Sequence, residues 1–363
     1  HAGVSVSNTA ASNQQPAIST KQASTHIHPE QPLSTVPHAS PKTSRSARAR
    51  TDPTTTTPPS SSLSPSFVST LPVPIPDLTP STSSPASSGP PPDHEAAFQA
   101  AVAAAGLSPL QVAQLHTYLD YLLEVNKTMN LTAVRDPLEC LDRHLADSLA
   151  LLPVIDHHWA ATNQERMAKK TETLLGSAPP AQGLRVIDVG TGAGLPGMVL
   201  AVARPTWKVT LLDSLRKRCD FLKKAAQLAG ITNVNVVWCR AEEGGRKMGL
   251  RDAHDLAVAR AVADSSELAE LCLPFVRPGG LWVAAKGPDP EVEVAGAAAA
   301  IQALGGVQLA LHRVASISAD GEQRTALVVH KVKPTHPRYP RATGTPKKSP
   351  ISVKEPDSVS GEG

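Results

Sequence analysis

The stretch Leu184–Ala201, LRVIDVGTGAGLPGMVLA, predicts how this chain folds. It begins with a short, mostly apolar run, which is typical of a buried parallel strand. Gly190, Gly192 and Gly194 then alternate through a turn where a ligand can approach bare backbone. Pro196 suits the first turn of a helix, because the N–H group that it lacks would be unpaired there. Since helix N-termini present free N–H groups, the stretch predicts a ligand-binding cradle.

The glycine pattern fits two kinds of nucleoside cofactor. Residues 192–197 match G-x-G-x-x-G, the dinucleotide fingerprint, which is a weak signal by itself. Asp188, an acidic residue, precedes the three alternating glycines. This pattern resembles the first motif of S-adenosylmethionine-dependent methyltransferases. We therefore expect S-adenosylmethionine as the cofactor. A dinucleotide and a purely structural turn are the alternatives.

Strand and helix patterns alternate from Leu184 onward, which predicts an α/β fold with a doubly wound, mostly parallel sheet. The second strand ends in Asp213, about 20 residues beyond the glycine loop, where an acidic side chain can bind both ribose hydroxyls of an adenosine. Two late strands are expected to form an antiparallel hairpin around Asp320 and Gly321. The predicted strands are 184–189, 207–212, 234–238, 255–259, 281–285, 307–314 and 325–331.

Composition limits the other interpretations. The chain has 363 residues and a net charge of +3, which is too mild to indicate a partner. No C-x-x-C pair occurs, so we expect no metal site and no disulfides, but buried free thiols in a reducing compartment. No apolar run approaches the ~20 residues of a membrane span, so we expect no membrane partner. The four cysteines are Cys140, Cys219, Cys239 and Cys272.

Residues 1–92 are rich in Ser, Thr, Pro and Ala and nearly lack aromatic residues. Such a segment cannot bury enough apolar surface to offset its chain entropy, so we predict disorder. Because the segment is poor in acids and rich in Ser, it resembles an organelle transit peptide. We expect a chloroplast location, with the mitochondrion or cytoplasm, and a plain low-complexity tail, as alternatives.

Residues 93–159 predict a small N-terminal helical subdomain. Asp93, Ser108 and Asp136 are helix N-cap signals, and the last two are followed by proline. The polar segment 126–135 is predicted to be a loop. The candidates for contact with a substrate are Asn130, Arg135, Arg143, His144 and Ser148. Each of them can equally be a cap or a solvated surface residue.

Two further segments lack a regular pattern. Residues 160–183 lose apolar periodicity and hold Gly and Pro, so we predict a loop inserted before the main domain, 184–332. Residues 333–363 are predicted to be a basic flexible tail. Such a tail can bind phosphate backbones through charge and counterion release. A solubilising tail is the alternative.

Several motifs together resemble one family over roughly residues 106–350, in the family's order. They are NLTAVRDP (130–137), RHLADSL (143–149), DVGTGAGLPG (188–197), LDSLRKR (212–218), RAEE (240–243), ARA (259–261), KG (286–287) and RYPRATGTP (338–346). The chain is similar to the bacterial 16S ribosomal RNA guanine-N7 methyltransferases, also called glucose-inhibited division protein B. Residues 1–92 and 160–183 lie outside the family pattern.

The resemblance implies a Rossmann-like class I S-adenosylmethionine methyltransferase. It would modify N7 of a guanosine in small-subunit ribosomal RNA, as naked RNA or in a 30S-type subunit, and we expect a monomer. The implied cofactor residues are Gly190, Gly192, Gly194, Leu195, Asp213, Ala241, Glu242 and Arg260. Asp213 would hold the ribose, and Ala241 with Glu242 would contact the adenine. The implied RNA-binding residues are Asn130, Arg143, His144, Lys217, Arg240, Lys286 and Arg324.

The expected chemistry needs no general base. Guanine N7 has a free lone pair and attacks a methyl group without losing a proton, so positioning and electrostatics suffice. Arg260, directly after the fourth strand, is the catalytic candidate, either reading guanine O6 or holding a phosphate. The chain has no Asn-Pro-Pro-Tyr type motif, which commonly accompanies exocyclic amine methylation. Cys239 is expected on a strand and Cys272 within a helix, so neither lies in a loop after the fourth strand, where a pyrimidine C5 nucleophile would be needed.

Three other functions remain open at this point. A small-molecule methyltransferase can share the fold. A non-enzymatic RNA-binding ribosome-assembly factor can keep it. A nicotinamide dehydrogenase would need a His/Arg or Tyr/Lys catalytic group, which we do not find.

Overall fold

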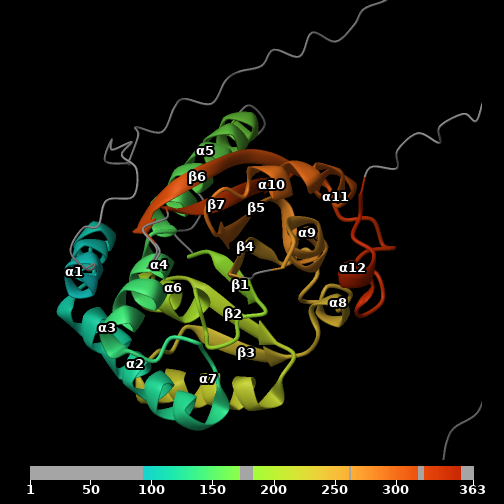
Figure 1. Ribbon diagram of the computed structural model, residues 1–363. Coiled ribbons are helices and arrows are strands. Elements are labelled where there is room, and N and C mark those ends of the chain that lie inside the picture. The colour runs from blue at the N-terminus through green and yellow to red at the C-terminus, as the bar shows by residue number, and fades with distance from the viewer. Residues whose placement is uncertain (1–92, 172–182, 261–262, 318–322, 353–363) are drawn as a thin grey trace, which may run out of the picture. The chain divides into compact units, whose positions relative to one another are not determined.

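The computed structural model describes residues 93–171, 183–260, 263–317 and 323–352. Within them, seven strands form one sheet in the order β3-β2-β1-β4-β5-β7-β6 (Figure 1). Strands β1 to β5 run parallel, and β7 is antiparallel to both β5 and β6. This topology confirms the predicted doubly wound sheet with a late antiparallel hairpin. The strands are β1 (Arg185–Val189), β2 (Lys208–Asp213), β3 (Val234–Trp238), β4 (His254–Arg260), β5 (Val276–Lys286), β6 (Gly306–Ile317) and β7 (Gln323–Lys331).

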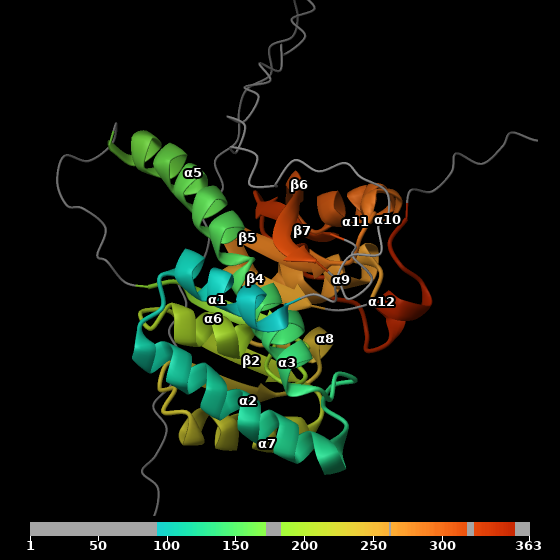
Figure 2. The same cartoon turned by 60° about the vertical axis from the view of Figure 1, so that its left-hand side comes forward.

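Helices cover both faces of the sheet (Figures 1 and 2). One face carries α1 (His94–Ala105), α2 (Pro109–Met129), α3 (Pro137–Cys140), a π-helix (Leu141–Ala146), α4 (Asp147–Leu149), α5 (Leu152–Thr171), α6 (Gly197–Ala203) and α7 (Arg216–Leu228). The other carries α8 (Ala241–Gly244), α9 (Ser265–Cys272), a 3₁₀-helix (Leu273–Phe275), α10 (Glu291–Gly296), α11 (Ala298–Ala303) and α12 (Thr345–Lys348).

Three helices begin where the sequence predicts. The side chains of Asp93, Ser108 and Asp136 each accept a hydrogen bond from a backbone amide in the first turn, which satisfies a donor that the helix leaves free. The predicted loop over 126–135 is wrong in its first part. Helix α2 continues to Met129, and its C-cap residue Asn130 has a left-handed φ of 52°, which ends the helix.

The N-terminal helices and the sheet share an apolar core. Phe98 of α1 and Leu122 of α2 belong to the same buried cluster as Val186 of β1 and Leu256 of β4. A second cluster, which includes Trp282 of β5, fills the opposite face of the sheet. The helical segment therefore packs on the sheet as a layer, and this fixes its loops relative to the strand ends.

The predicted loop over 160–183 is wrong in its first half. Helix α5 continues to Thr171, and residues 172–182 lie outside the described part of the chain. The segment between Ala160 and Thr171 contains neither Gly nor Pro, so nothing in it breaks a helix. Apolar periodicity is lost there although the backbone remains helical.

The predicted flexible tail is wrong as far as residue 352. Tyr339 is buried among the apolar side chains of the second cluster. Arg246 and Arg251 donate hydrogen bonds of 2.6–2.9 Å to carbonyl groups along residues 335–340. The proline-rich, basic composition favours disorder, but these partners lie far upstream in the sequence and hold the segment on the fold.

An ion pair between Arg341 and Glu270 fixes this segment, and we predict that breaking it destabilises the protein. Glu270 of α9 is 0% exposed, and Arg341 donates to both of its carboxylate oxygens, with contacts of 2.6–3.0 Å. Changing Arg341 to Met leaves a buried unpaired charge and should lower the free energy of unfolding by about 3 kcal/mol, measured by urea denaturation. The double variant Arg341→Met/Glu270→Gln should recover part of the loss. An unchanged Arg341→Met midpoint would contradict the prediction.

All four cysteines are buried and none forms a disulfide, as predicted. No helix in the described part of the chain combines the length and apolar character needed to cross a membrane. Residues 1–92, together with Asp320 and Gly321 of the predicted hairpin turn, lie outside the described residues.

Candidate cofactor and substrate site

The glycine loop leaves open space at its first glycine. Gly190 has a φ of 72°, and a Cβ added there would meet no atom within 4 Å. Gly192 has a φ of 59°, and its amide donates a hydrogen bond to Asp213 at 3.0 Å. Both values lie in the left-handed region that side chains disfavour. The backbone of Gly190 therefore borders open space that a ligand can enter.

The later part of the loop serves packing. A Cβ on Gly194 would lie 2.9 Å from Leu222 and 3.2 Å from the Tyr118 hydroxyl. A Cβ on Gly197 would lie 2.7 Å from Asp188. The predicted cofactor residue Leu195 is buried in the core, so its side chain serves packing as well. A cofactor contact of Gly194 or Leu195 would have to come from the backbone.

The Asp188 carboxylate ties the glycine loop to α6. Its Oδ2 accepts hydrogen bonds from the Thr191 hydroxyl at 2.5 Å and from the Gly197 amide at 2.8 Å. The other oxygen, Oδ1, is buried with no hydrogen-bond partner. Burial raises the pKa of this carboxyl to about 6. Asp188 therefore fixes the conformation of the glycine loop through buried hydrogen bonds.

Asp213 lies where the sequence predicts, at the carboxyl end of β2 and beside the glycine loop. The side chain is buried, and its two oxygens accept hydrogen bonds from the amides of Gly192 at 3.0 Å and Leu215 at 2.8 Å. The Arg218 guanidinium lies 3.7 Å from it. The loop and the acidic strand end, far apart in sequence, form one edge of the site.

The predicted adenine residues lie at the start of α8. Ala241 packs partly buried against the second apolar cluster. Glu242 accepts a hydrogen bond from the Gly344 amide at 2.9 Å. Gly344 belongs to the C-terminal segment, so that segment reaches the side of the site where the adenine is expected.

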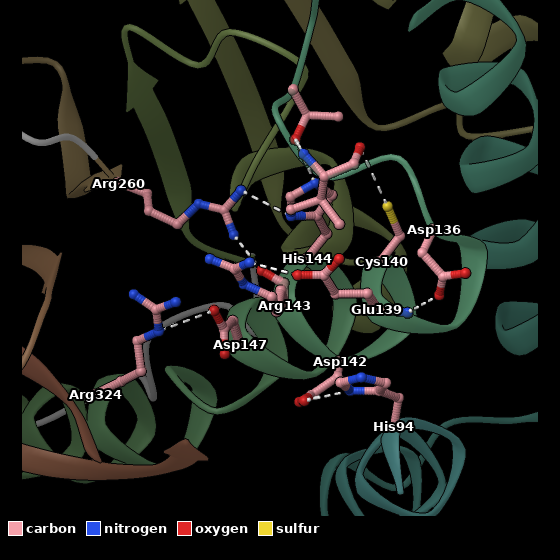
Figure 3. A network of polar contacts seen from close by, with 12 residues as sticks. His94, Asp136, Glu139, Cys140, Asp142, Arg143, His144, Asp147, Arg260 and Arg324 are labelled. Carbon is pink, nitrogen blue, oxygen red and sulfur yellow. Dashed lines mark hydrogen bonds and ion pairs between the residues drawn. The ribbon is translucent and has the colours of Figure 1, made fainter. Parts of the chain in front are cut away.

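Arg260 belongs to a polar network and lies beside Arg143 and His144 (Figure 3). Its guanidinium donates to the Arg143 carbonyl oxygen at 3.0 Å and faces His144 Nδ1 at 3.5 Å. Burial lowers the pKa of Arg260, and attraction to Asp147 and Asp188 opposes that shift. The structure therefore brings together Arg260, Arg143 and His144 from distant parts of the chain.

His144 is placed differently from its predicted role as an RNA contact. The ring is 5% exposed, and its Nε2 lies 2.7 Å from the Thr132 hydroxyl. Burial, and then the charge of Arg260, lower the pKa of His144 to about 4. Because a guanidinium only donates, we assign Nδ1 as the acceptor and Nε2–H as the donor to Thr132. A buried neutral ring offers no charge to a phosphate.

The π-helix explains how two groups from neighbouring residues reach Arg260. Across this turn the Asp147 amide bonds to the Asp142 carbonyl, five residues back instead of four. The wider turn presents the Arg143 carbonyl and the His144 ring toward the same guanidinium. The sequence predicts an ordinary helix here, with an apolar stripe of Leu138, Leu141, Leu145, Leu149 and Leu152. The structure leaves Leu138 exposed.

We predict that His144 acts by orienting Arg260, and two variants can separate its contacts. His144→Asn keeps an acceptor near the Nδ1 position, and His144→Gln keeps a donor near the Nε2 position. Methyl transfer should stay within about threefold of wild type in the Asn variant and fall about tenfold or more in the Gln variant, since misplaced groups cost rate. Cofactor affinity, measured by calorimetry, should change little in both. Equal rates for the two variants would contradict the prediction.

Three other predicted RNA contacts are paired with carboxylates. Arg143 lies 2.5 Å from Glu139, and Arg324 lies 3.3 Å from Asp147. Lys286 is buried, pairs with Glu293 at 2.6 Å and donates to the Ala263 carbonyl at 2.9 Å. Lys286 is therefore not a free surface cation, which contradicts its predicted role as an RNA contact in this conformation. Sequence alone does not show these acidic partners.

The remaining candidates separate into exposed and buried residues. Lys217 on α7 and Arg240 at the start of α8 are exposed, as an RNA contact requires. Asn130 and Arg135 are exposed and bonded to each other at 3.3 Å. Ser148 is buried, and its hydroxyl donates to the His144 carbonyl at 2.5 Å, so a substrate contact is wrong for this residue.

Sequence reasoning missed three residues of the site. The Tyr118 hydroxyl donates to the Ala193 carbonyl at 2.7 Å and holds the glycine loop against α2. Thr132 supports His144, and Asp147 pairs with Arg324. Tyr118 lies in an apolar helical stripe, where its ring masks the polar signal of its hydroxyl. Among the described residues, no three His, Cys, Asp or Glu side chains gather closely enough to hold a metal ion.

Comparisons with known proteins agree with these features. Residues 111–163 and 171–320 match a family model described as rRNA small subunit methyltransferase G. The ribosomal RNA small subunit methyltransferase G of Moorella thermoacetica is 40% identical over 245 residues, which cover 68% of this chain and 92% of that protein. Its counterpart in Alkaliphilus metalliredigens is 42% identical over 241 residues, which cover 66% and 91%. The chain belongs to the rRNA small subunit methyltransferase G family.

Proposed function

We propose that this chain transfers a methyl group from S-adenosylmethionine to N7 of a guanosine in small-subunit ribosomal RNA. The proposal rests on family membership and on one structural observation. The buried Asp213 carboxylate contacts the glycine loop beside the open space at Gly190. Open sheets of this kind bind nucleosides at the carboxyl ends of their strands, where both groups lie.

The residues present fit this cofactor. Asp213 can accept hydrogen bonds from ribose hydroxyls, since each carboxylate oxygen has a second lone pair beyond those used by Gly192 and Leu215. The backbone at Gly190 can approach the methionine portion, and Ala241 with Glu242 can face the adenine. When bound, S-adenosylmethionine supplies an electrophilic methyl group on a positively charged sulfur.

Arg260 would position the guanine. The guanidinium carries five N–H donors, and the contacts with Arg143 and His144 use two. The remaining donors are available for guanine O6, which Arg commonly recognises, or for a phosphate oxygen. Guanine N7 needs no deprotonation, so the chain has to orient the base and exclude water. A neutral His144 suits this role because it accepts from Arg260 without repelling it.

The test is methyl transfer in vitro with tritiated S-adenosylmethionine. We expect label in small-subunit ribosomal RNA or in the isolated small subunit, and little in large-subunit RNA or transfer RNA. RNA affinity, measured by filter binding at two salt concentrations, should fall steeply with salt. Cofactor binding without transfer to any RNA would favour an assembly factor. A weak salt dependence would favour a small-molecule substrate.

We further propose a chloroplast location for the protein. The support is the composition of residues 1–92, which are Ser-rich and poor in acids. Fused to a fluorescent protein, this segment should direct import into isolated chloroplasts and not into mitochondria. Import into mitochondria alone, or into neither organelle, would contradict the proposal.

A further inference from the structure

An exposed tryptophan stands at the edge of the sheet, next to the proposed cofactor site. Trp238 is the last residue of β3, which is the edge strand of the sheet (Figure 1). It pairs in register with Asp213, so the two backbones lie about one strand spacing, or roughly 5 Å, apart. The Trp238 side chain is 56% exposed. The methyl-transfer site described above does not use it.

The indole is held in a fixed orientation. Its Nε1–H donates to the Ser214 carbonyl at 3.0 Å, and the Arg216 guanidinium lies 5.3 Å from the ring centroid. That distance is within the range of a cation–π contact. One hydrogen bond and one cation thus hold a large aromatic ring at the surface. The ring therefore loses little side-chain conformational entropy when it binds a partner.

The charge around the ring favours a polyanion. Arg216 has a 72% exposed side chain and Lys217 follows it in the first turn of α7, while Arg240 follows Trp238 by two residues. The only acidic neighbour paired with this group in the described residues is Asp220, 3.9 Å from Arg216. A symmetric contact with a second copy would bring these positive charges face to face. An aromatic ring among basic residues is typical of single-stranded nucleic-acid binding.

We propose that Trp238, with Arg216 against its ring, is a stacking platform for an unpaired base of the RNA substrate. This inference rests on the proposed function, because it takes RNA as the partner. Stacking here would anchor a nucleotide near the target guanosine, while Lys217 and Arg240 neutralise the adjoining phosphates. Stacking needs only the π-face of a base, so the platform should tolerate any sequence.

The experiment measures binding of the full chain to a fluorescein-labelled 12-nucleotide oligoadenylate by anisotropy. Trp238→Ala and Trp238→Leu should bind about five- to tenfold more weakly than wild type, and Trp238→Phe should stay within about twofold, because stacking requires an aromatic face. Val292→Ala, which removes an exposed apolar residue of α10, is the matched control and should bind as wild type does. Oligoadenylate should quench tryptophan fluorescence in wild type and much less in Trp238→Phe.

Several results would overturn the platform. Unchanged affinity of Trp238→Ala would do so, as would equal affinities of the Leu and Phe variants. A dimer that Trp238→Ala converts to a monomer in sedimentation would identify a protein contact in place of RNA. Oligoadenylate binding requires neither cofactor nor guanine. Absence of methyl transfer would therefore reject the proposed function and leave the oligoadenylate affinities unchanged. Normal methyl transfer, together with wild-type oligoadenylate affinity of the Trp238 variants, would reject the stacking platform alone.

Discussion

Arg260→Ala is expected to lower kcat/KM for RNA methylation by about 100- to 1000-fold, the loss typical of removing one preorganised donor from a catalytic site. The guanidinium lies at the end of β4, held by the Arg143 carbonyl and faced by His144. Its surroundings are largely buried, so its charge acts in a medium that screens it weakly. The loss of rate should exceed any loss of cofactor affinity, because the proposed partner of Arg260 is the guanine or its phosphate.

Two variants make this prediction specific. Arg260→Lys keeps the charge but not the planar fork of donors, so it should remain well below wild type. Arg185→Ala removes an arginine at the amino end of β1, opposite the site, and should leave the rate unchanged. If Arg260→Ala methylated RNA at the wild-type rate with unchanged cofactor affinity, the assigned role would be wrong.

The second large effect is expected at Asp213. Changing it to Asn keeps the size of the side chain but removes the charge, which weakens two expected hydrogen bonds to the ribose. Hydrogen bonds to charged groups contribute about 1.5–3 kcal/mol each, so cofactor affinity should fall roughly 100-fold. Calorimetric titration with S-adenosylmethionine measures this change. At saturating cofactor the rate should largely recover, because the proposed role of Asp213 is to bind the ribose of the cofactor and not the target guanine.

The control for Asp213→Asn is Asp120→Asn on α2, which makes the same chemical change at an exposed position. It should bind the cofactor as wild type does. Asp213 also accepts hydrogen bonds from the amides of Gly192 and Leu215, so the thermal midpoint of the variant must be measured alongside. A folded Asp213→Asn variant with undiminished cofactor affinity would contradict the ribose role.

The sequence was sufficient for features with a local signature. A glycine turn after an apolar strand, and an acid at the next strand end, predicted where Gly192 and Asp213 lie, although the hydrogen bond between them appears only in the structure. The sequence also predicts the helix caps at Asp93, Ser108 and Asp136, because each side chain accepts a hydrogen bond from an amide only a few residues away. These features depend on spacing along the chain, and spacing is what a sequence records.

The features that the sequence did not reveal depend on distant partners. The motif that contains His144 predicts an RNA contact, but the position of the ring beside Arg260 depends on a π-helical turn and on burial. Lys286 looks like a free cation until Glu293 of α10 is seen beside it. The C-terminal segment looks disordered until Arg246 and Arg251 are seen to bind its carbonyl groups. Such partners become visible only when the chain folds.

Two arginines near Arg260 are held in place by carboxylates. Arg143 and Arg324 lie against Glu139 and Asp147, so each is oriented before substrate arrives. Lys217 and Arg240 are exposed, as a first electrostatic contact with RNA would require.

The most direct test of the central claim is where the methyl group goes. Small-subunit RNA treated with the protein and S-adenosylmethionine should be reduced with borohydride and cleaved with aniline, a treatment that breaks the chain at N7-methylguanosine. We predict one new cleavage site at a guanosine, which requires the cofactor and is absent with Arg260→Ala. Methyl incorporation without any such cleavage would place the modification on another atom and contradict the account.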